Sequence, residues 1–280
     1  MSYALGMEKR KGIIIYGPTA SGKSSLGIEL ARDRDGIIVN ADSLQVYKDL
    51  PVLTACPPPE DLEKVQHYLY TFLAGDDNCS AGRYLSFVKE LLDREERLPI
   101  IVGGTGLYLK SLLEGYSPMP EISEDIRKEA RSKDIVEIAA YVAERDKDFA
   151  HKDQQRLRRA YEVIRASSKS YSYWIAQPKI KLIAVDFEFI KLSPPREELY
   201  KRCDLRFEQM LEQGAIEEVE ALMYKNYPPD ATIMKAVGVA EISAYLAGEM
   251  TREQMVAKAQ QKTRNYAKRQ LTWLRTQFAY

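Results

Sequence analysis

One short stretch combines glycine, lysine and serine in a spacing that binds phosphate. It follows the pattern G-x-x-x-x-G-K-S and comprises Gly17, Pro18, Thr19, Ala20, Ser21, Gly22, Lys23 and Ser24, with Ser25 after them. In such a loop, backbone N–H groups and a helix N-terminus surround an anion, and the lysine adds a positive charge. The serine hydroxyl is placed to bind Mg²⁺. The pattern therefore predicts a phosphate-binding loop with Mg²⁺ as its cofactor, rather than a plain glycine-rich turn.

Asp42 is a candidate for proton transfer because it follows a second apolar run. Residues 36–41 are short, β-branched and bounded by glycine and charged residues, as in a buried strand. Ligands of an open parallel sheet bind outside the carboxyl ends of its strands, so Asp42 should face the same crevice as Lys23. An aspartate after a strand is also a common helix N-cap, and the spacing leaves capping and chemistry equally open.

Two further stretches carry side chains that could meet a ligand. The apolar run 98–102 leads into the G-G-T-G stretch 103–106, where glycines permit close backbone approach and Thr105 offers a hydroxyl. These residues alone slightly favour a tight turn. The run 180–186 ends in Asp186, which could hold a metal, although an aspartate in that place is usually a turn residue or a cap.

The elements around these residues alternate between strand and helix. The apolar run 12–16 reads as the first strand, and helical spacing of apolar residues follows it. Within the insertion the alternation stops, and residues 123–170 read as helices with short breaks. The sequence therefore predicts an α/β fold: a P-loop NTPase-like parallel-sheet core, residues 1–117 and 179–280, with a helical insertion domain, residues 118–178.

The composition excludes several classes of protein. The 280 residues are 45% hydrophobic and 29% charged, as in a globular protein. No apolar run reaches membrane-spanning length, and residues 1–11 lack the apolar stretch of a signal peptide. The three cysteines and two histidines have no metal-binding spacing. We therefore expect a cytoplasmic monomer that does not bind membranes.

Two local patches of positive charge could bind a polyanion, although the 41 basic and 41 acidic residues balance overall. The patch in the insertion contains Lys152, Arg156, Arg158, Arg159, Arg165 and Lys169. The patch in the closing segment, which has no acidic residue after Lys258, contains Lys262, Arg264, Lys268, Arg269 and Arg275. Charge runs are usually solvated helix faces. Beside a phosphate site, however, such patches indicate a polyanionic substrate.

Taken in order along the chain, these motifs resemble the tRNA dimethylallyltransferases, also called tRNA isopentenyltransferases. A phosphate loop alone is shared with many kinases, whereas the ordered set of motifs is far more specific. The resemblance runs through the whole chain and is carried by residues 17–24, 42–43, 45–47, 54–55, 103–108, 154–160, 162–163, 263–264 and 266–273.

The resemblance implies transfer of a dimethylallyl group from dimethylallyl pyrophosphate to the exocyclic N6 of an adenine next to the tRNA anticodon. Asp42 matches the family's general base, which accepts a proton from the attacking amine. Lys23, Thr105 and Lys235 match residues that meet the leaving pyrophosphate, together with residues 17–25 and Mg²⁺. The adenine must leave its stack to reach the base, so RNA and donor would enter a channel from opposite sides.

The same resemblance implies tRNA contacts in three parts of the chain. They are Asp42, Ser43, Gln45, Val46 and Tyr47 after the second strand, Gln154, Gln155, Arg156, Arg158 and Arg159 in the insertion, and Arg264, Lys268 and Arg269 in the closing segment. We expect the insertion to hold the anticodon stem and the closing helix to hold RNA backbone nearer the flipped base.

The chain departs from the family pattern at two places. Cys56 stands where the family usually has lysine, and Val239 and Ala240 follow Gly238 where the family usually has tyrosine and a basic residue. These departures concern substrate contacts rather than the reaction type. Three alternatives stay open: an adenylate isopentenyltransferase that modifies a free nucleotide, a small-molecule kinase, and a catalytically silent tRNA-binding protein. The basic insertion argues against the first of these, because a mononucleotide needs no extended cationic lobe.

Overall fold

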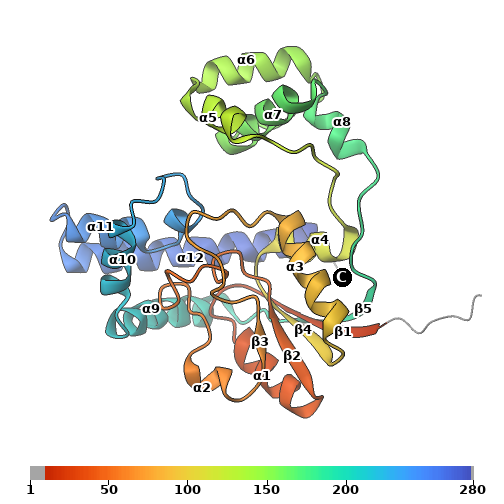
Figure 1. Ribbon diagram of the computed structural model, residues 1–280. Coiled ribbons are helices and arrows are strands. Elements are labelled where there is room, and N and C mark those ends of the chain that lie inside the picture. The colour runs from red at the N-terminus through yellow and green to blue at the C-terminus, as the bar shows by residue number, and fades with distance from the viewer. Residues whose placement is uncertain (1–9, 279–280) are drawn as a thin grey trace, which may run out of the picture. The chain divides into compact units, whose positions relative to one another are not determined.

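The computed structural model describes residues 10–278 (Figure 1). The chain divides into two compact units. Unit 1 combines the residues up to 113 with those from 182 onward, and unit 2 comprises residues 114–181. The sequence placed the corresponding boundaries at 117/118 and 178/179.

Unit 1 is built on a five-stranded sheet in which every neighbouring pair is parallel. The strand order is β3-β2-β4-β1-β5. The strands are β1 (Arg10–Tyr16), β2 (Gly36–Asn40), β3 (His67–Tyr68), β4 (Leu98–Gly103) and β5 (Val185–Lys191). The side chains of β1, β2 and β4 are buried almost without alternation, as expected for a parallel sheet covered on both faces. The predicted α/β fold with a P-loop NTPase-like parallel sheet is thus confirmed.

Helix α1 (Lys23–Asp33) begins within the phosphate loop and covers one face of this sheet. Its Ile28 and Ala31 pack against isoleucines and valines of β1, β2 and β4. The shorter elements around the sheet are α2 (Pro59–Leu62), α3 (Ala81–Arg94) and α4 (Gly106–Glu114). These connections carry the chain from the carboxyl end of one parallel strand to the start of the next.

The C-terminal part of unit 1 is helical. It contains α9 (Arg196–Glu212), α10 (Ala215–Tyr224), the 3₁₀ turn η1 (Ile233–Lys235), α11 (Val239–Leu246) and α12 (Arg252–Gln277). Helix α12 begins at a capping box in which Thr251 and Gln254 bond each other's backbone N–H groups. It packs beside α9 and α11 (Figure 1) and buries Ala267, Leu274 and Phe278, as the predicted apolar stripe requires.

The expectation that Asp186 ends a strand is wrong. Strand β5 begins at Val185, so Asp186 lies near its amino end, level with Lys11 of β1. Its carboxylate pairs with the Lys11 ammonium at 2.5 Å, and both side chains are exposed. Asp186 therefore lies at the edge of the sheet opposite to the phosphate loop and cannot hold a metal ion there.

Unit 2 contains four helices within the described residues: α5 (Glu124–Ser132), α6 (Ile135–Arg145), α7 (Gln154–Ser167) and α8 (Tyr171–Ala176). A side-chain oxygen accepts a backbone N–H at the N-terminus of each helix, and these caps are Ser123, Asp134, Asp153 and Ser170. The first three helices enclose a small core of their own, formed by Ala130, Ile138, Val142, Ala160, Tyr161 and Ile164. Unit 2 thus has the hydrophobic core that a separate domain needs.

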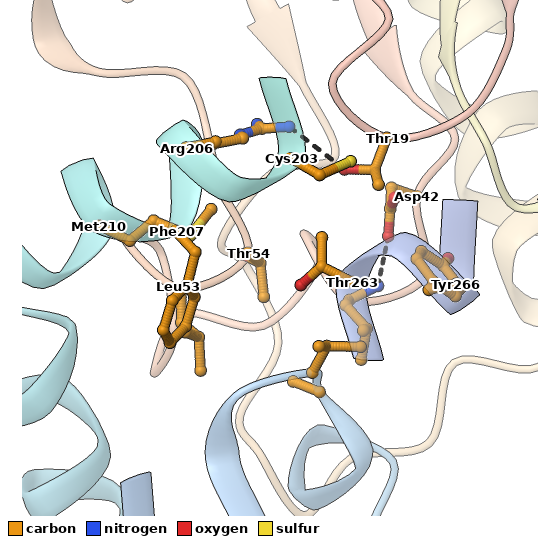
Figure 2. Close-up of a pocket in the computed structure, with 13 residues that line it drawn as sticks. Thr19, Asp42, Leu53, Thr54, Cys203, Arg206, Phe207, Met210, Thr263 and Tyr266 are labelled. Atoms are coloured by element: carbon orange, nitrogen blue, oxygen red, sulfur yellow. Dashed lines mark hydrogen bonds between the residues drawn. The ribbon is translucent and has the colours of Figure 1, made fainter. Parts of the chain in front are cut away.

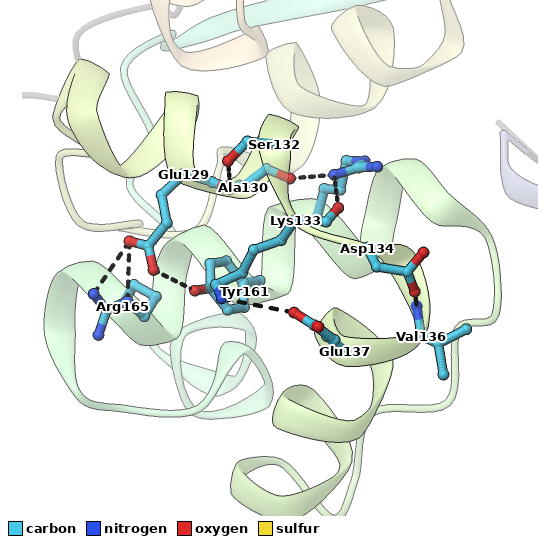
Figure 3. Close-up of polar contacts among 10 residues, drawn as sticks. Glu129, Ala130, Ser132, Lys133, Asp134, Val136, Glu137, Tyr161 and Arg165 are labelled. Carbon is cyan, nitrogen blue, oxygen red and sulfur yellow. Dashed lines mark hydrogen bonds and ion pairs between the residues drawn. The ribbon is translucent and has the colours of Figure 1, made fainter.

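Polar contacts between helices complete unit 2 (Figure 3). Tyr161 of α7 donates to Glu129 of α5 at 2.7 Å, and Arg165 donates to the other oxygen of the same carboxylate at 3.1 Å. The hydrogen bond from Tyr161 is the main reason that the pKa of Glu129 is lowered. Arg158 donates to backbone carbonyls at the end of α5, among them that of Ala130. Two arginines of α7 therefore stabilise the fold of this unit.

No helix among residues 10–278 combines the length and the apolar character that crossing a bilayer requires.

Candidate active site

Three loops meet at the carboxyl ends of β2, β4 and β1, because these strands are neighbours in the sheet. The phosphate loop follows β1, the turn with Asp42 follows β2, and the loop with Thr105 follows β4. The hydroxyl of Thr105 accepts from the Ser43 backbone N–H at 2.9 Å and donates to the Ser43 hydroxyl at 3.3 Å. The structure thus brings Lys23, Asp42 and Thr105 to one end of the sheet, as predicted.

The phosphate loop has the backbone of an anion-binding nest. Ala20 and Gly22 both have positive φ, at 59° and 92°, on either side of Ser21. The Lys23 ammonium donates to the carbonyl of Pro18 at 2.6 Å and lies 3.4 Å from the Ser21 hydroxyl. The ammonium is therefore held over the concave side of the loop.

Burial lowers the pKa of Lys23 to about 8, and the negative charge of Asp42 offsets part of that effect. Lys23 thus loses its charge far more easily than an exposed lysine. A phosphate ligand would favour the charged form, because opposite charges stabilise each other.

Asp42 is half-buried and begins a turn rather than a helix, since the next helix starts at Pro59. Its backbone N–H donates to the Asn40 side chain at 2.7 Å. Its carboxylate oxygen Oδ1 accepts from the Leu44 N–H at 3.0 Å. These two bonds fix the orientation of the carboxylate, so the alternative of a helix N-cap does not hold.

Asp42 opens into a pocket of about 610 Å³, its mouth included (Figure 2). Thr19, Asp42 and Arg206 form a polar side of this pocket, whereas Leu53, Phe207 and Met210 form an apolar side (Figure 2). The remaining lining residues are Leu44, Thr54, Cys203, Ala236, Val237, Thr263 and Tyr266. A carboxylate, a cation and an apolar wall suit a ligand that carries both phosphate and hydrocarbon.

Arg206 is a site residue that the sequence analysis missed. Its guanidinium donates to the Thr19 hydroxyl at 3.3 Å (Figure 2), and burial lowers its pKa. It lies on α9 beside Phe207, within an apolar stripe that the spacing did reveal. A lone arginine at the edge of that stripe was the available signal.

The structure corrects two of the expected tRNA contacts. Val46 and Tyr47 are fully buried, and the Tyr47 hydroxyl donates to the Asp77 carbonyl at 3.0 Å. Their side chains therefore belong to the core and cannot touch RNA. The neighbouring Gln45 donates to the carbonyls of Thr54 and Ala55, both at 2.9 Å, and so holds the loop that lines the pocket.

Lys235 does not line the pocket that contains Asp42. It is exposed and lines an adjoining pocket with Lys262 and Arg269. The two pockets share Ala236 and Val237. This second pocket is bordered by three cations and therefore suits RNA phosphate as well as pyrophosphate.

Cys56, at one of the departures from the family pattern, lies close to the pocket. Its thiol is 3.6 Å from the Gln45 carbonyl and 3.4 Å from the Thr54 hydroxyl. Burial raises the pKa of Cys56 to about 12, so the thiol stays protonated and unreactive at neutral pH.

The remaining predicted tRNA contacts differ in how freely they reach solvent. Gln154, Gln155 and Arg156 are exposed on α7, and so are Lys268 and Arg269 on α12. Arg159 pairs with Glu162 at 3.1 Å, and Arg264 pairs with Asp204 at 2.5 Å.

Arg158 stands apart because the carbonyls at the end of α5 occupy its guanidinium. The expectation that Arg158 binds tRNA is therefore replaced by a role in the fold of unit 2.

The residues present fit a Mg²⁺ ion that binds together with phosphate. Ser24 is exposed in the first turn of α1, next to the nest. No group of three or more histidine, cysteine or acidic side chains among residues 10–278 could hold a metal by itself. Mg²⁺ usually keeps several waters and binds through substrate phosphates and one or two protein oxygens, which agrees with this arrangement.

The chain matches a family and several characterised structures. The family model described as IPP transferase matches residues 45–277. A tRNA dimethylallyltransferase of Chelativorans sp. (strain BNC1) is 46% identical, over 94% of both chains. One of Bradyrhizobium sp. (strain ORS 278) is 44% identical, over 97% of this chain and 92% of its own.

Among solved structures, a eukaryotic dimethylallyltransferase crystallised acting on tRNA superposes with a TM-score of 0.81 at 28% identity, over 95% of this chain and 70% of that chain. The tRNA isopentenylpyrophosphate transferase of Staphylococcus epidermidis superposes with a TM-score of 0.66 at 33% identity, over 95% of this chain and 90% of that chain. With a family model over most of its length and relatives above 40% identity, the chain belongs to the IPP transferase family, as the order of its motifs indicated.

Proposed function

We propose that the protein transfers a dimethylallyl group from dimethylallyl pyrophosphate to N6 of the adenine next to the tRNA anticodon. The observation that carries this proposal is the pocket, in which Asp42 faces a cationic side and an apolar side at once. A nucleotide kinase needs the cations but not the apolar wall. The relatives named as tRNA enzymes also favour this reaction over an adenylate isopentenyltransferase, a kinase or a silent binding protein.

The donor would bind with its pyrophosphate at the nest and its hydrocarbon against Leu53, Phe207 and Met210. Lys23 and Arg206 would then meet the negative charge that grows on the pyrophosphate as its bond to carbon breaks. Mg²⁺, held by pyrophosphate and the Ser24 hydroxyl, would supply further positive charge at the same oxygens.

The acceptor adenine would enter the pocket from the RNA and place N6 against Asp42. An exocyclic amine is a weak nucleophile, so it needs a base as the new bond forms. N6 bonds to the allylic carbon, the carbon–oxygen bond of the donor breaks, and one N6 proton passes to the Asp42 carboxylate. Thr105, bonded to Ser43, would hold the turn that carries this base.

Mass spectrometry of nucleosides tests the reaction directly. Incubation of bulk tRNA with the protein, Mg²⁺ and dimethylallyl pyrophosphate should yield N6-dimethylallyl adenosine. Parallel reactions receive AMP in place of tRNA, or ATP in place of the donor. Product on AMP but not on tRNA would favour the free-nucleotide enzyme, and ATP turnover without prenylation would favour a kinase. We place this reaction in the cytoplasm and expect a monomer to carry it out.

Unit 2 would bind the anticodon stem through exposed basic residues of α7. Reversing Arg156 and Arg159 to glutamate should raise the tRNA concentration for half-maximal rate, with little loss of rate at saturation. Each lost phosphate contact should lower the salt dependence of binding by about 0.7 to 0.9 in the logarithmic slope. Steady-state kinetics over a range of tRNA and salt concentrations measures both effects.

Reversing Lys128 and Lys147, which are exposed in the same unit, is the matched control because it changes net charge equally. Equal effects of the two double variants would mean that α7 is not a specific RNA-binding face.

A further inference from the structure

Gln270 is a buried polar residue that the proposed reaction does not use. It lies on α12 and is 7% exposed. Its Oε1 accepts from the Thr19 backbone N–H at 2.8 Å, and its Nε2 donates to the Gly104 carbonyl at 3.1 Å. One partner is a donor and the other an acceptor, so only a group with both functions satisfies both. Gln270 therefore bonds the phosphate loop and the loop after β4 at the same time.

Helix α12 approaches the loop after β4 so closely that glycine is required there. A Cβ on Gly104 would clash with the Gln270 amide, and a Cβ on Gly106 would clash with the Trp273 ring. The helix therefore lies directly against this loop, with no room for other side chains. The two hydrogen bonds of Gln270 are part of a close-packed contact rather than a surface interaction.

Each partner of Gln270 leads to one side of the proposed reaction. Thr19 belongs to the phosphate loop, and its hydroxyl accepts from Arg206 on the polar side of the pocket. Gly104 precedes Thr105, whose hydroxyl bonds the backbone N–H and the hydroxyl of Ser43. Ser43 directly follows Asp42. The leaving group and the base are thus joined through one side chain.

We propose that Gln270 is a positioning residue that sets the phosphate loop and the Asp42 turn in register for transfer. The proposal rests on the function proposed above and goes beyond it, because Gln270 need not touch either substrate. A displacement of reacting groups by about 1 Å can cost roughly 100-fold in rate. Losing Gln270 should therefore slow the chemical step much more than it weakens the binding of pyrophosphate or tRNA.

The first test replaces the amide by a chain of similar length without its hydrogen bonds. Gln270→Met should lower the single-turnover rate, with both substrates saturating, by about 10- to 100-fold. The affinities for pyrophosphate and for tRNA should stay within a few-fold of the parent protein, and circular dichroism should confirm a folded chain. A variant that lost affinity in proportion to rate would show that Gln270 acts through binding.

The matched control lies on the same helix. Gln260 donates to the Asp204 carbonyl at 3.2 Å and to Glu208 at 3.0 Å, so it also bonds α12 to another segment. Neither partner belongs to the two loops. Gln260→Met should therefore keep a near-normal transfer rate, and a loss as large as that of Gln270→Met would refute a specific role for Gln270.

The second variant, Gln270→Glu, tests the hydrogen-bond pattern itself. An ionised carboxylate keeps the bond from Thr19 but repels the Gly104 carbonyl, whereas a protonated carboxyl accepts from one and donates to the other. The cations that face the phosphate loop, Lys23 and Arg206, favour the ionised form, and Asp42 opposes it. The rate relative to the parent protein should therefore recover as the pH falls.

The outcomes separate this inference from the proposed function. If the parent protein transfers no dimethylallyl group, the proposed function fails and this inference fails with it. If the parent protein is active and Gln270→Met is equally fast, only the inference is wrong. A Gln270→Glu variant whose relative rate does not change with pH would also contradict the role assigned to the amide.

Discussion

Replacing Asp42 by asparagine should reduce the saturated rate of transfer by about 10²- to 10⁴-fold, the usual effect of removing a general base. Asparagine keeps the shape of the side chain and its bond with the Leu44 N–H. It cannot take the proton that N6 must lose. Single-turnover kinetics with saturating donor and tRNA measures this loss, and the affinity for tRNA should stay within a few-fold of that of the parent protein.

Asp186→Asn is the matched control for this prediction. Asp186 is the other aspartate that the sequence offered beside a strand, and it lies at the opposite edge of the sheet, paired with Lys11. Its replacement should leave the rate unchanged. A near-normal rate for Asp42→Asn would remove Asp42 from the mechanism.

Replacing Lys23 by alanine should slow transfer by about 10²- to 10³-fold, because the charge it meets is largest in the transition state. Inhibition by free pyrophosphate should weaken as well. Lys64, an exposed lysine of unit 1 that pairs with Asp61, provides the control Lys64→Ala. Unchanged inhibition by pyrophosphate in Lys23→Ala would contradict the proposed position of the phosphate groups.

The pH dependence gives a second view of Lys23. Its pKa of about 8 means that the free protein carries the ammonium below that pH and a neutral amine above it. The value of kcat/KM for the donor should therefore fall as the pH rises through about 8. In Lys23→Arg the guanidinium stays charged, so this alkaline decrease should shift to higher pH, whatever the absolute rate of the variant.

The features that local sequence patterns could predict are those set by neighbouring residues. Apolar runs identified β1, β2 and β4, because a strand buried on both faces needs a short continuous run. The glycine and lysine spacing identified the phosphate loop for a similar reason, since the nest is formed by consecutive backbone groups. Parallel strand order then brought Asp42 and Thr105 to the same end of the sheet.

The features that stayed hidden depend on contacts between distant segments. Gln270 and Thr19 are 251 residues apart, and no local pattern reports such a hydrogen bond. Arg206 reaches the pocket only because α9 packs where it does. Arg158 looked like one of several equivalent basic residues until its carbonyl partners on α5 were apparent.

The errors have physical causes of the same kind. Val46 and Tyr47 match a family motif, but a match does not distinguish a residue that touches substrate from one that supports the loop. Asp186 was placed at the end of a strand because the apolar run before it was taken as the strand. In the structure that run largely precedes β5, and pairing with β1 sets the register.

The central claim is that N6 of one adenine attacks the donor while Asp42 takes its proton. The most direct test uses a synthetic anticodon stem-loop with dimethylallyl pyrophosphate and Mg²⁺, followed by position-resolved mass spectrometry of the RNA over time. The parent protein should add one dimethylallyl group to N6 of the adenine next to the anticodon, and Asp42→Asn should form the same product far more slowly. Modification at another atom, or equal rates for the two proteins, would contradict the account.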